Sequence, residues 1–385
     1  MKSTVQTIDP TGTKLLREFK HDCPLMSCVI DPTGRWCFAG GRSRKIYLTN
    51  INWGSTEALD DHESWVVASA RWSTADVPVT SPASQLSPPP PPLPQPRAQD
   101  KPASSVGRIA NPSQVAGTSE KQSLVVTGDL VGRLICWDTL GERPRVCWSI
   151  ETDHGTLRTV AISHDGKLVV TGGGDGMVRL WSMANGASVG ELGGHACPVF
   201  SSAFHPDGIH LLTGDRGDQK IKQWDYGTGK ELREFDAKDL SNYKGGTDIN
   251  YGGVRDLAFN TDGSVIFCCG RDSYGRPALV LQFDWKTGKQ IRKQVSTFAN
   301  SIFHHLAFHP QGFFVTSGVG AQTGEIWFWK PEQEEKLASI KVTGPAYGMN
   351  LHPNGRHIAV AQMIGPSTYG DRGVVGLYEI PLSKT

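Results

Sequence analysis

Several features are scarce in this sequence of 385 residues, and each shortage excludes a class of protein. Methionine occurs only 6 times against 44 glycines and 24 prolines, a composition that fits long helices poorly and turn-rich β proteins well. Net charge is nearly absent, because 39 Lys and Arg residues face 38 Asp and Glu residues, so the whole chain does not attract nucleic acid or anionic lipid. No apolar run approaches the roughly 18 to 20 residues that cross a bilayer, so we expect no membrane and a cytoplasmic location.

Catalytic and metal-binding motifs are scarce as well. The eight cysteines form no CxxC pair, and we interpret them as reduced thiols that lie mostly among apolar strand residues. Neither HExxH nor GxxxxGK[ST] occurs. The glycine-rich stretch from Thr171 to Gly176 leads into a strand instead of a helix, so it does not fit a phosphate-binding loop. We therefore expect no metal, no cofactor and no catalytic residues.

The chain does contain an internal repeat. Polar turns that end in glycine follow short apolar runs at six places, namely Gly34, Gly166, Gly208, Gly263, Gly312 and Gly355. From Gly166 onward the spacings are 42, 55, 49 and 43 residues, close to the roughly 40 to 45 residues of a four-stranded propeller blade. Each turn precedes a β-branched run, and a further strand then ends in an aromatic residue. The pattern predicts four short antiparallel strands per unit.

These units resemble the WD-repeat family of seven-bladed β-propellers. Two units match the family's structural quartet of His, Thr, Asp and Trp, which the resemblance implies to be a hydrogen-bonded chain: His154, Thr171, Asp175 and Trp181, then His195, Thr213, Asp218 and Trp224. The other units depart from it. The first has Thr49 in place of Trp, the second has Val131 in place of Asp, and the fifth and seventh have Phe283 and Tyr378 in place of Trp.

We therefore expect one all-β domain over residues 1–385, a seven-bladed β-propeller of four-stranded antiparallel blades. The last unit has no outer strand of its own, whereas the segment from Lys14 to Lys20 matches the outer strand of the fourth unit. We predict that this N-terminal strand closes the ring and leaves no open sheet edge. The segment from Thr4 to Asp9 has no vacant place in a blade, and it lies along the rim or pairs with another molecule.

One insertion interrupts the second unit. Residues 74–122 form a 49-residue segment with 11 prolines and no aromatic residue, which predicts disorder with local polyproline II structure. A proline-rich run can also bind an aromatic groove, but Pro96 directly precedes Arg97 and the usual proline–arginine spacing is not met. We favour a passive tether over a ligand motif.

Four histidines occupy the same polar turn in different units: His164, His205, His309 and His352. Equivalent positions of a propeller are spread around the ring, too far apart for shared metal coordination at roughly 2.0 to 2.1 Å. We interpret them as turn residues.

Loop length singles out one face, which we call the top, where connections from outer to inner strands and from second to third strands emerge. The long versions lie in the second half of the chain, at residues 237–253, 270–277, 317–324 and 362–373. They and the entrance ends of the inner strands are rich in Tyr and Arg, which are frequent at binding hot spots. The predicted partner-binding residues are Trp65, Phe200, Tyr243, Tyr251, Arg255, Arg271, Asp272, Tyr274, Arg276, Phe303, Tyr347, Tyr369 and Arg372.

The leading hypothesis is a non-enzymatic scaffold that binds a protein or peptide, and not nucleic acid, through the top loops of blades four to seven. One alternative is a propeller hydrolase or lyase, which would need His, Asp or Glu residues converging at the mouth of the central channel. A second alternative is a structural subunit of a larger complex. Fold analogy alone does not choose among them.

Overall fold

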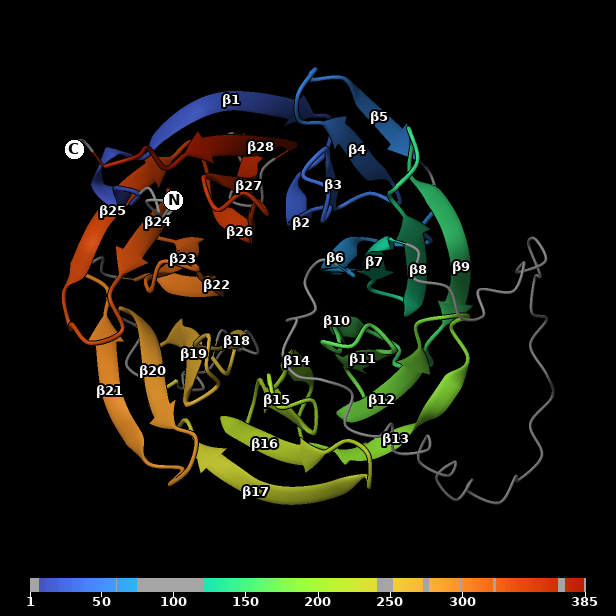
Figure 1. The fold of residues 1–385 in the computed structure, drawn as a ribbon, viewed down its shortest axis with the longest axis vertical. Helices are drawn as coiled ribbons and strands as arrows, with labels where there is room; N and C mark the ends of the chain where they lie inside the picture. The colour runs from blue at the N-terminus through green and yellow to red at the C-terminus, as the bar shows by residue number, and fades with distance from the viewer. Residues whose placement is uncertain are drawn as a thin grey trace, which may run out of the picture.

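The computed structural model describes residues 7–59, 61–74, 121–240, 252–272, 277–297, 300–320, 323–365 and 371–383. Its strands form seven four-stranded antiparallel sheets arranged in a ring, as Figure 1 shows. The one helical element in the described ranges is a short 3-10 turn, η1 (Pro10–Gly12). The protein is a seven-bladed β-propeller.

The blades follow one another around the ring, each with its first strand innermost. Blades 1 to 3 are β2 (Leu25–Ile30), β3 (Trp36–Gly41), β4 (Ile46–Asn50) and β5 (Thr56–Leu59); β6 (Val66–Ser73), β7 (Ser123–Asp129), β8 (Arg133–Asp138) and β9 (Arg145–Glu151); β10 (Leu157–Ile162), β11 (Leu168–Gly173), β12 (Met177–Ser182) and β13 (Ser188–Gly194). Blades 4 and 5 are β14 (Val199–Phe204), β15 (His210–Asp215), β16 (Lys220–Asp225) and β17 (Lys230–Asp236); β18 (Asp256–Phe259), β19 (Val265–Arg271), β20 (Ala278–Asp284) and β21 (Gln290–Val295). Blades 6 and 7 are β22 (Ile302–Phe308), β23 (Phe314–Val319), β24 (Gly324–Trp329) and β25 (Lys336–Val342); β26 (Ala346–Leu351), β27 (His357–Ile364), β28 (Arg372–Glu379) and the N-terminal β1 (Lys14–His21).

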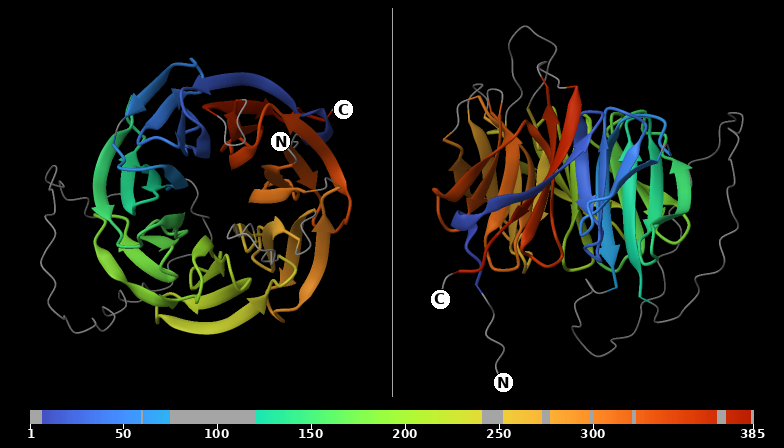
Figure 2. Two further views of the ribbon diagram at one scale, coloured as in Figure 1. Left: turned by 180° about the vertical axis from the view of Figure 1, so that it is seen from behind. Right: turned by 90° about the horizontal axis from the view of Figure 1, so that it is seen from above.

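The N-terminal strand closes the ring, as the sequence predicts. β1 pairs antiparallel with β28 from Lys14 opposite Glu379 to His21 opposite Gly373. Blade 7 is therefore built from both ends of the chain, and both ends emerge on one side of the ring (Figure 2). Ile8 forms a bridge with Leu382, and the backbone N–H of Asp9 donates to Pro381 O at 2.8 Å. The described residues before β1 thus lie along the C-terminal segment, on the rim.

Neighbouring blades are joined by their turn residues on the side opposite the top face. His205 Nε2 lies 3.0 Å from Gly263 O, His309 Nε2 lies 2.6 Å from Gly355 O, and His352 Nε2 lies 3.0 Å from Gly34 O. The glycine on each accepting turn has a positive φ, for example +73° at Gly34. A Cβ on Gly34 would meet His352 Cε1 at 2.4 Å, so this glycine is required both by its backbone angle and by the close approach of the histidine.

Apolar side chains from facing blades form the cores between them. Between blades 3 and 4, for example, Val178 and Leu180 of β12 pack with Val199 of β14 and Trp224 of β16. Burying each such side chain contributes roughly 1.5 to 3 kcal/mol relative to leaving it exposed. Six of the eight cysteines are buried, and all eight are free thiols, as predicted.

The insertion connects the first two strands of blade 2. Thr74 and Gln122 face each other where it begins and ends, since the Thr74 N–H donates to Gln122 O and the Gln122 N–H donates to Thr74 Oγ1, both at 3.2 Å. Residues 75–120, with the proline run, lie outside the described residues. Within the described ranges, no helix has the length and apolar character needed to span a membrane.

Candidate functional site

The quartet of blade 3 is a continuous chain of hydrogen bonds. Trp181 Nε1 donates to Thr171 Oγ1 at 2.7 Å, Thr171 Oγ1 lies 2.8 Å from His154 Nε2, and His154 Nδ1 lies 2.8 Å from Asp175 Oδ1. Burial lowers the pKa of His154, against the opposing effect of Asp175. The chain of hydrogen bonds ties the segment before the innermost strand β10 to the third strand β12, with Trp181, Thr171 and His154 buried and Asp175 exposed.

The quartet of blade 4 uses a different carboxylate from the one that the sequence pattern indicates. His195 Nδ1 lies 3.1 Å from Asp215 Oδ2, while Thr213 and Trp224 occupy their expected places. Asp218 is exposed, and its backbone N–H donates to Asp215 Oδ1 at 2.9 Å. The prediction of Asp218 is therefore wrong. The residue six positions before Trp224 lies in the loop after β15, whereas the carboxylate that contacts His195 is at the end of β15.

Blade 2 has a complete quartet that the sequence analysis missed. His62 Nε2 lies 2.9 Å from Thr127 Oγ1, which also accepts from Trp137 Nε1, and His62 Nδ1 lies 3.3 Å from Asp129 Oδ2. Burial opposes ionisation of Asp129, yet hydrogen bonds from His62 and from the N–H groups of Glu63 and Arg133 lower its pKa. The signal is the shared Thr-Gly-Asp sequence at the ends of β7 and β15, which places the carboxylate two residues after the threonine.

The innermost strands present one half-buried residue each at the top of the central channel. In six blades the register shifts by one residue at this point, a β-bulge that turns a side chain out of the alternating pattern. In blade 5 Arg255 holds the same place directly before β18, and its N–H donates to Cys269 O at 2.9 Å. We call these seven residues the mouth ring: Met26, Val67, Arg158, Phe200, Arg255, His304 and Tyr347.

Positive charge gathers on one side of the mouth ring. The guanidinium carbons of Arg158, Arg216 and Arg255 lie 5.2, 5.6 and 5.1 Å from the centre of the Phe200 ring. Arg216 comes from the connection that follows β15. No two of these three groups, which we call the arginine cluster, are therefore more than about 11 Å apart, and their mutual repulsion is on the order of 1 kcal/mol per pair.

The other side of the mouth ring is aromatic and apolar. The rings of His304 and Tyr347 lie with their centroids 4.9 Å apart across the boundary of blades 6 and 7. Burial, with a further contribution from Arg255, holds the pKa of His304 well below its usual range, so this imidazole is neutral at neutral pH. Met26 and Val67 continue the ring in blades 1 and 2.

A family model described as WD domain, G-beta repeat matches residues 13–50, 146–182, 186–225 and 243–275. These four segments are WD repeats. Relatives include WD repeat-containing protein 91 of Xenopus tropicalis, 26% identical over 43% of this chain and 23% of the relative, and that of Bos taurus, 28% identical over 37% of this chain and 20% of the relative. Eukaryotic translation initiation factor 3 subunit I of Taeniopygia guttata is 24% identical over 48% of this chain and 54% of the relative. The matched part thus spans between a fifth and about half of the length of these relatives.

The WD-repeat propeller brings together some of the predicted partner-binding residues. Phe200, Arg255 and Tyr347 belong to the mouth ring, and Trp65, 37% exposed, lies beside it with the Arg42 guanidinium 4.5 Å from its ring. Arg271 ends β19 and Asp272 follows it, both half-buried, while Arg372 is exposed at the start of β28. Tyr243, Tyr251, Tyr274, Arg276 and Tyr369 lie outside the described residues.

The prediction of Phe303 as a partner-facing residue is wrong. Its side chain is fully buried and packs edge-to-face on Trp327, with ring centroids 4.8 Å apart. The bulge in β22 makes the next residue, His304, the member of the mouth ring. The sequence pattern did not indicate three residues at the mouth, namely Arg158, Arg216 and His304. The position along the inner strand could have revealed Arg158 and His304. Counting back four residues from the apolar ends of the inner strands, at Ile162 and Phe308, gives Arg158 and His304.

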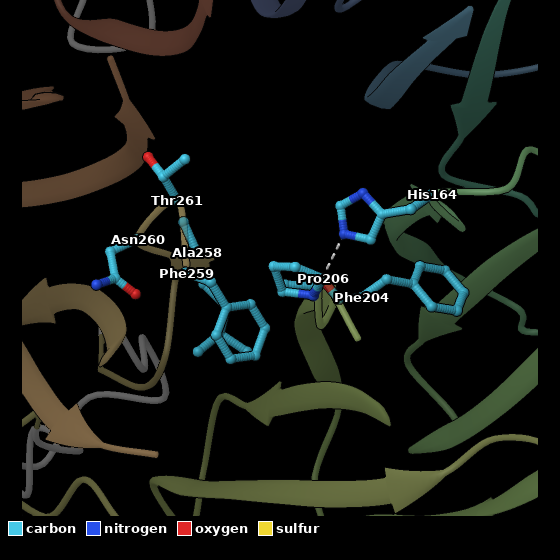
Figure 3. A pocket seen from close by; sticks show the side chains of 9 residues that line it. His164, Phe204, Pro206, Ala258, Phe259, Asn260 and Thr261 are labelled. Atoms are coloured by element: carbon cyan, nitrogen blue, oxygen red, sulfur yellow. Dashed lines mark hydrogen bonds between the residues drawn. The ribbon is translucent and has the colours of Figure 1, made fainter. Parts of the chain in front are cut away.

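A pocket of about 410 Å³ lies at the opposite end of the inner strands of blades 3 to 5 (Figure 3). Its lining is mainly apolar, with Phe204, Pro206 and Phe259 prominent, and its polar side chains are His164, Asn260 and Thr261. His164 Nε2 lies 3.2 Å from Phe204 O, the contact drawn as a dashed line in Figure 3. No carboxylate or thiol lines this pocket, so its described lining offers no acid–base pair.

Two local patterns could suggest chemistry. His205, Asp207 and His210 are a group of metal-ligand type within the described ranges. However, His205 Nε2 is directed at Gly263 O, and His205 Nδ1 accepts the Asp207 N–H at 3.1 Å, so the turn's own hydrogen bonds account for its geometry. Residues 186–190 match GxSxG, but Ser188 starts the outermost strand β13, whereas a nucleophile elbow joins a strand to a helix.

Proposed function

We propose that this WD-repeat propeller is a non-enzymatic scaffold that binds a protein or peptide partner through its top face. The observation that carries the proposal is the mouth ring, because one half-buried residue of each blade lies at the top of the central channel, in six of the seven blades at a β-bulge. Arg, Tyr and Phe side chains are typical anchors of protein interfaces. Arg271 at the end of β19, the following Asp272, and Arg372 at the start of β28 form the outer part of the proposed surface.

The names of the relatives support a role in interactions. They describe a repeat-containing protein and a subunit of a translation initiation factor, and neither name is that of an enzyme. We make no enzymatic proposal, since His304 is accompanied by no carboxylate within the mouth ring, whereas a hydrolase or lyase would be expected to gather His, Asp or Glu residues there. Cytoplasmic residence stays a prediction.

Affinity purification with quantitative mass spectrometry tests this function. The test variant combines Arg271→Ala, Tyr274→Ala and Arg372→Ala on the proposed surface, and the control combines Lys167→Ala, Lys286→Ala and Lys289→Ala on exposed residues at the opposite ends of the strands. We expect a reproducible set of proteins to be lost, at least fivefold, from the first variant and kept by the control. Equal recovery by both variants would contradict binding through the top face.

A second candidate role is that of a fixed subunit within a larger assembly. It is supported by the relative named as subunit I of an initiation factor. Size-exclusion chromatography with light scattering on native extract distinguishes the two roles. A stable assembly would elute far above the 41.8 kDa of the chain, whereas a scaffold with exchanging partners would elute largely near that mass.

A further inference from the structure

Two cysteines of blade 2 lie opposite each other on its two outer strands. Cys136 is on β8, and Cys147 is on the outermost strand β9. Cys136 pairs with Trp148, and the next residue, Trp137, pairs with Val146, so Cys147 is the extra residue of a β-bulge. Because two residues of a bulged strand oppose one residue of its partner, Cys147 shares with Trp148 the place opposite Cys136. The bulge brings the two thiols together, and their side chains are hydrogen-bonded to each other.

The two thiols differ in their exposure to solvent. Cys136 is fully buried in the core between blades 2 and 3, whereas Cys147 is exposed. All eight cysteines lie within the described ranges, and Cys147 is the one exposed thiol among them. A small oxidant from solvent therefore reaches this pair through Cys147.

The hydrogen bond gives the two sulfurs different reactivity. It lowers the pKa of Cys147, against the opposing effects of burial and of the charge of Asp138. The same hydrogen bond, together with burial, raises the pKa of Cys136. Since the thiolate is the nucleophile in thiol chemistry, Cys147 is the sulfur that reacts first, and Cys136 stays protonated beside it.

We propose that Cys147 and Cys136 form a peroxide-responsive pair, in which Cys147 is oxidised first and Cys136 then closes a disulfide between β9 and β8. The Cys147 thiolate attacks one oxygen of hydrogen peroxide, the O–O bond breaks, and the released hydroxide takes a proton from solvent to become water. The Cys136 sulfur then attacks the sulfur of the Cys147 sulfenic acid, the S–O bond breaks, and the Cys136 proton leaves with the hydroxide as a second water. Two electrons pass from the two thiols to the peroxide. The pair lies on the outer strands, so the inference does not depend on partner binding at the mouth ring.

Two other cysteine pairs of the chain provide an internal comparison. Cys28 and Cys37 are hydrogen-bonded to each other, but both are buried, and this hydrogen bond and burial raise the pKa of Cys37. Cys268 and Cys269 are consecutive on β19, so their side chains point to opposite faces of the sheet. Neither pair combines two adjoining sulfurs with access from solvent, so we expect the response to be specific to Cys136 and Cys147.

Peroxide treatment of the full chain at neutral pH tests the inference. After alkylation under denaturing, non-reducing conditions, the number of alkylated cysteines should fall from eight to six, and dithiothreitol should restore all eight. Trypsin cleaves after Arg145 and separates the two cysteines into residues 134–145 and 146–158, which the disulfide should link. This linked species should form at least tenfold faster than any species that joins Cys28 to Cys37.

Three variants assign the roles of the two sulfurs. Cys136→Ser leaves Cys147 without its second sulfur, so the sulfenic acid should persist and dimedone labelling of Cys147 should rise at least fivefold over the wild type. Cys147→Ser should keep its seven remaining thiols alkylatable. Cys197→Ser, at a half-buried position outside the pair, is the control and should form the linked peptides at the wild-type rate. If Cys136→Ser does not fold, the linked peptides of the wild type and the response of Cys147→Ser decide.

Three results would overturn the inference. The first is the absence of a link between residues 134–145 and 146–158 after peroxide treatment. The second is an equal loss of alkylatable thiols in Cys147→Ser and in the wild type. The third is a disulfide that joins Cys147 to the same residue of a second chain instead of to Cys136.

Discussion

The assignment of the blade 4 carboxylate leads to a sharp stability prediction. Asp215 is 1% exposed, and its side chain lies 3.1 Å from His195 Nδ1 and accepts the Asp218 N–H at 2.9 Å. Asp215→Ala removes both interactions and leaves the buried His195 nitrogen without its partner. Asp218→Ala, three residues later, removes an exposed side chain and keeps the backbone N–H that donates to Asp215.

The expected magnitudes differ by several kcal/mol. A hydrogen bond to a charged group contributes about 1.5 to 3 kcal/mol, and leaving a buried polar group unsatisfied costs about 1 to 3 kcal/mol. We therefore expect Asp215→Ala to lower the free energy of unfolding by about 3 kcal/mol. Asp218→Ala should change it by less than about 0.5 kcal/mol, as is usual for an exposed site. For a chain of this size, 1 kcal/mol corresponds to roughly 1 to 2 °C in Tm, so the difference is about 4 °C.

Circular dichroism melts and urea unfolding of the two variants measure this difference. Asp129→Ala in blade 2 is an independent repeat, because its buried carboxylate accepts from His62 and from the N–H groups of Glu63 and Arg133. Its loss should be at least as large as that of Asp215→Ala. Equal destabilisation by Asp215→Ala and Asp218→Ala would refute the assignment.

Three further predictions concern stability. Gly34→Ala should lower the free energy of unfolding by about 3 kcal/mol, and Gly208→Ala by only about 1 kcal/mol. Both glycines have φ near +70°, but only at Gly34 would the added Cβ meet a side chain, that of His352. Equal losses of Tm would contradict this. Burial lowers the pKa of His21 to about 4, so the folded state disfavours its protonation. The free energy of unfolding should therefore keep its full value above the unfolded-state pKa of 6.5 and fall by about 2 kcal/mol by pH 5. His21→Phe should reduce this pH dependence, as measured by urea unfolding at a series of pH values. Deleting residues 75–120 with a short Gly-Ser turn should shift Tm by less than about 2 °C, because Thr74 and Gln122 already pair; loss of folding would refute a passive tether.

The fold was largely predictable from the sequence, because it depends on repeated local patterns. The turn glycines that mark the repeat, such as Gly34 and Gly263, do adopt left-handed backbone angles, which few other residues tolerate. The match of the segment from Lys14 to Lys20 with an outer strand sufficed to predict the closure of blade 7. Each of these features is contained in one short stretch of sequence, so it can be recognised without knowing which residues pack against that stretch.

The quartets and the mouth were predictable only in part, because they depend on registers that differ by one or two residues. A count of six residues back from the tryptophan finds Asp175 in blade 3, where glycines occupy the three positions after Thr171, but finds Asp218 and Val131 in blades 4 and 2. A bulge likewise moves the half-buried position of the mouth ring from Phe303 to His304. The arginine cluster needs the ring itself, since Arg158 and Arg255 meet at Phe200 only when blades 3 and 5 flank blade 4.

Site-specific photocrosslinking tests the central claim, which is that partners bind at the mouth ring of the top face. Benzoylphenylalanine replaces Tyr347 in the mouth ring or Thr261 in the pocket at the opposite end of the inner strands. We expect crosslinked partner bands from position 347 and none from position 261. Crosslinks from position 261 alone would contradict it.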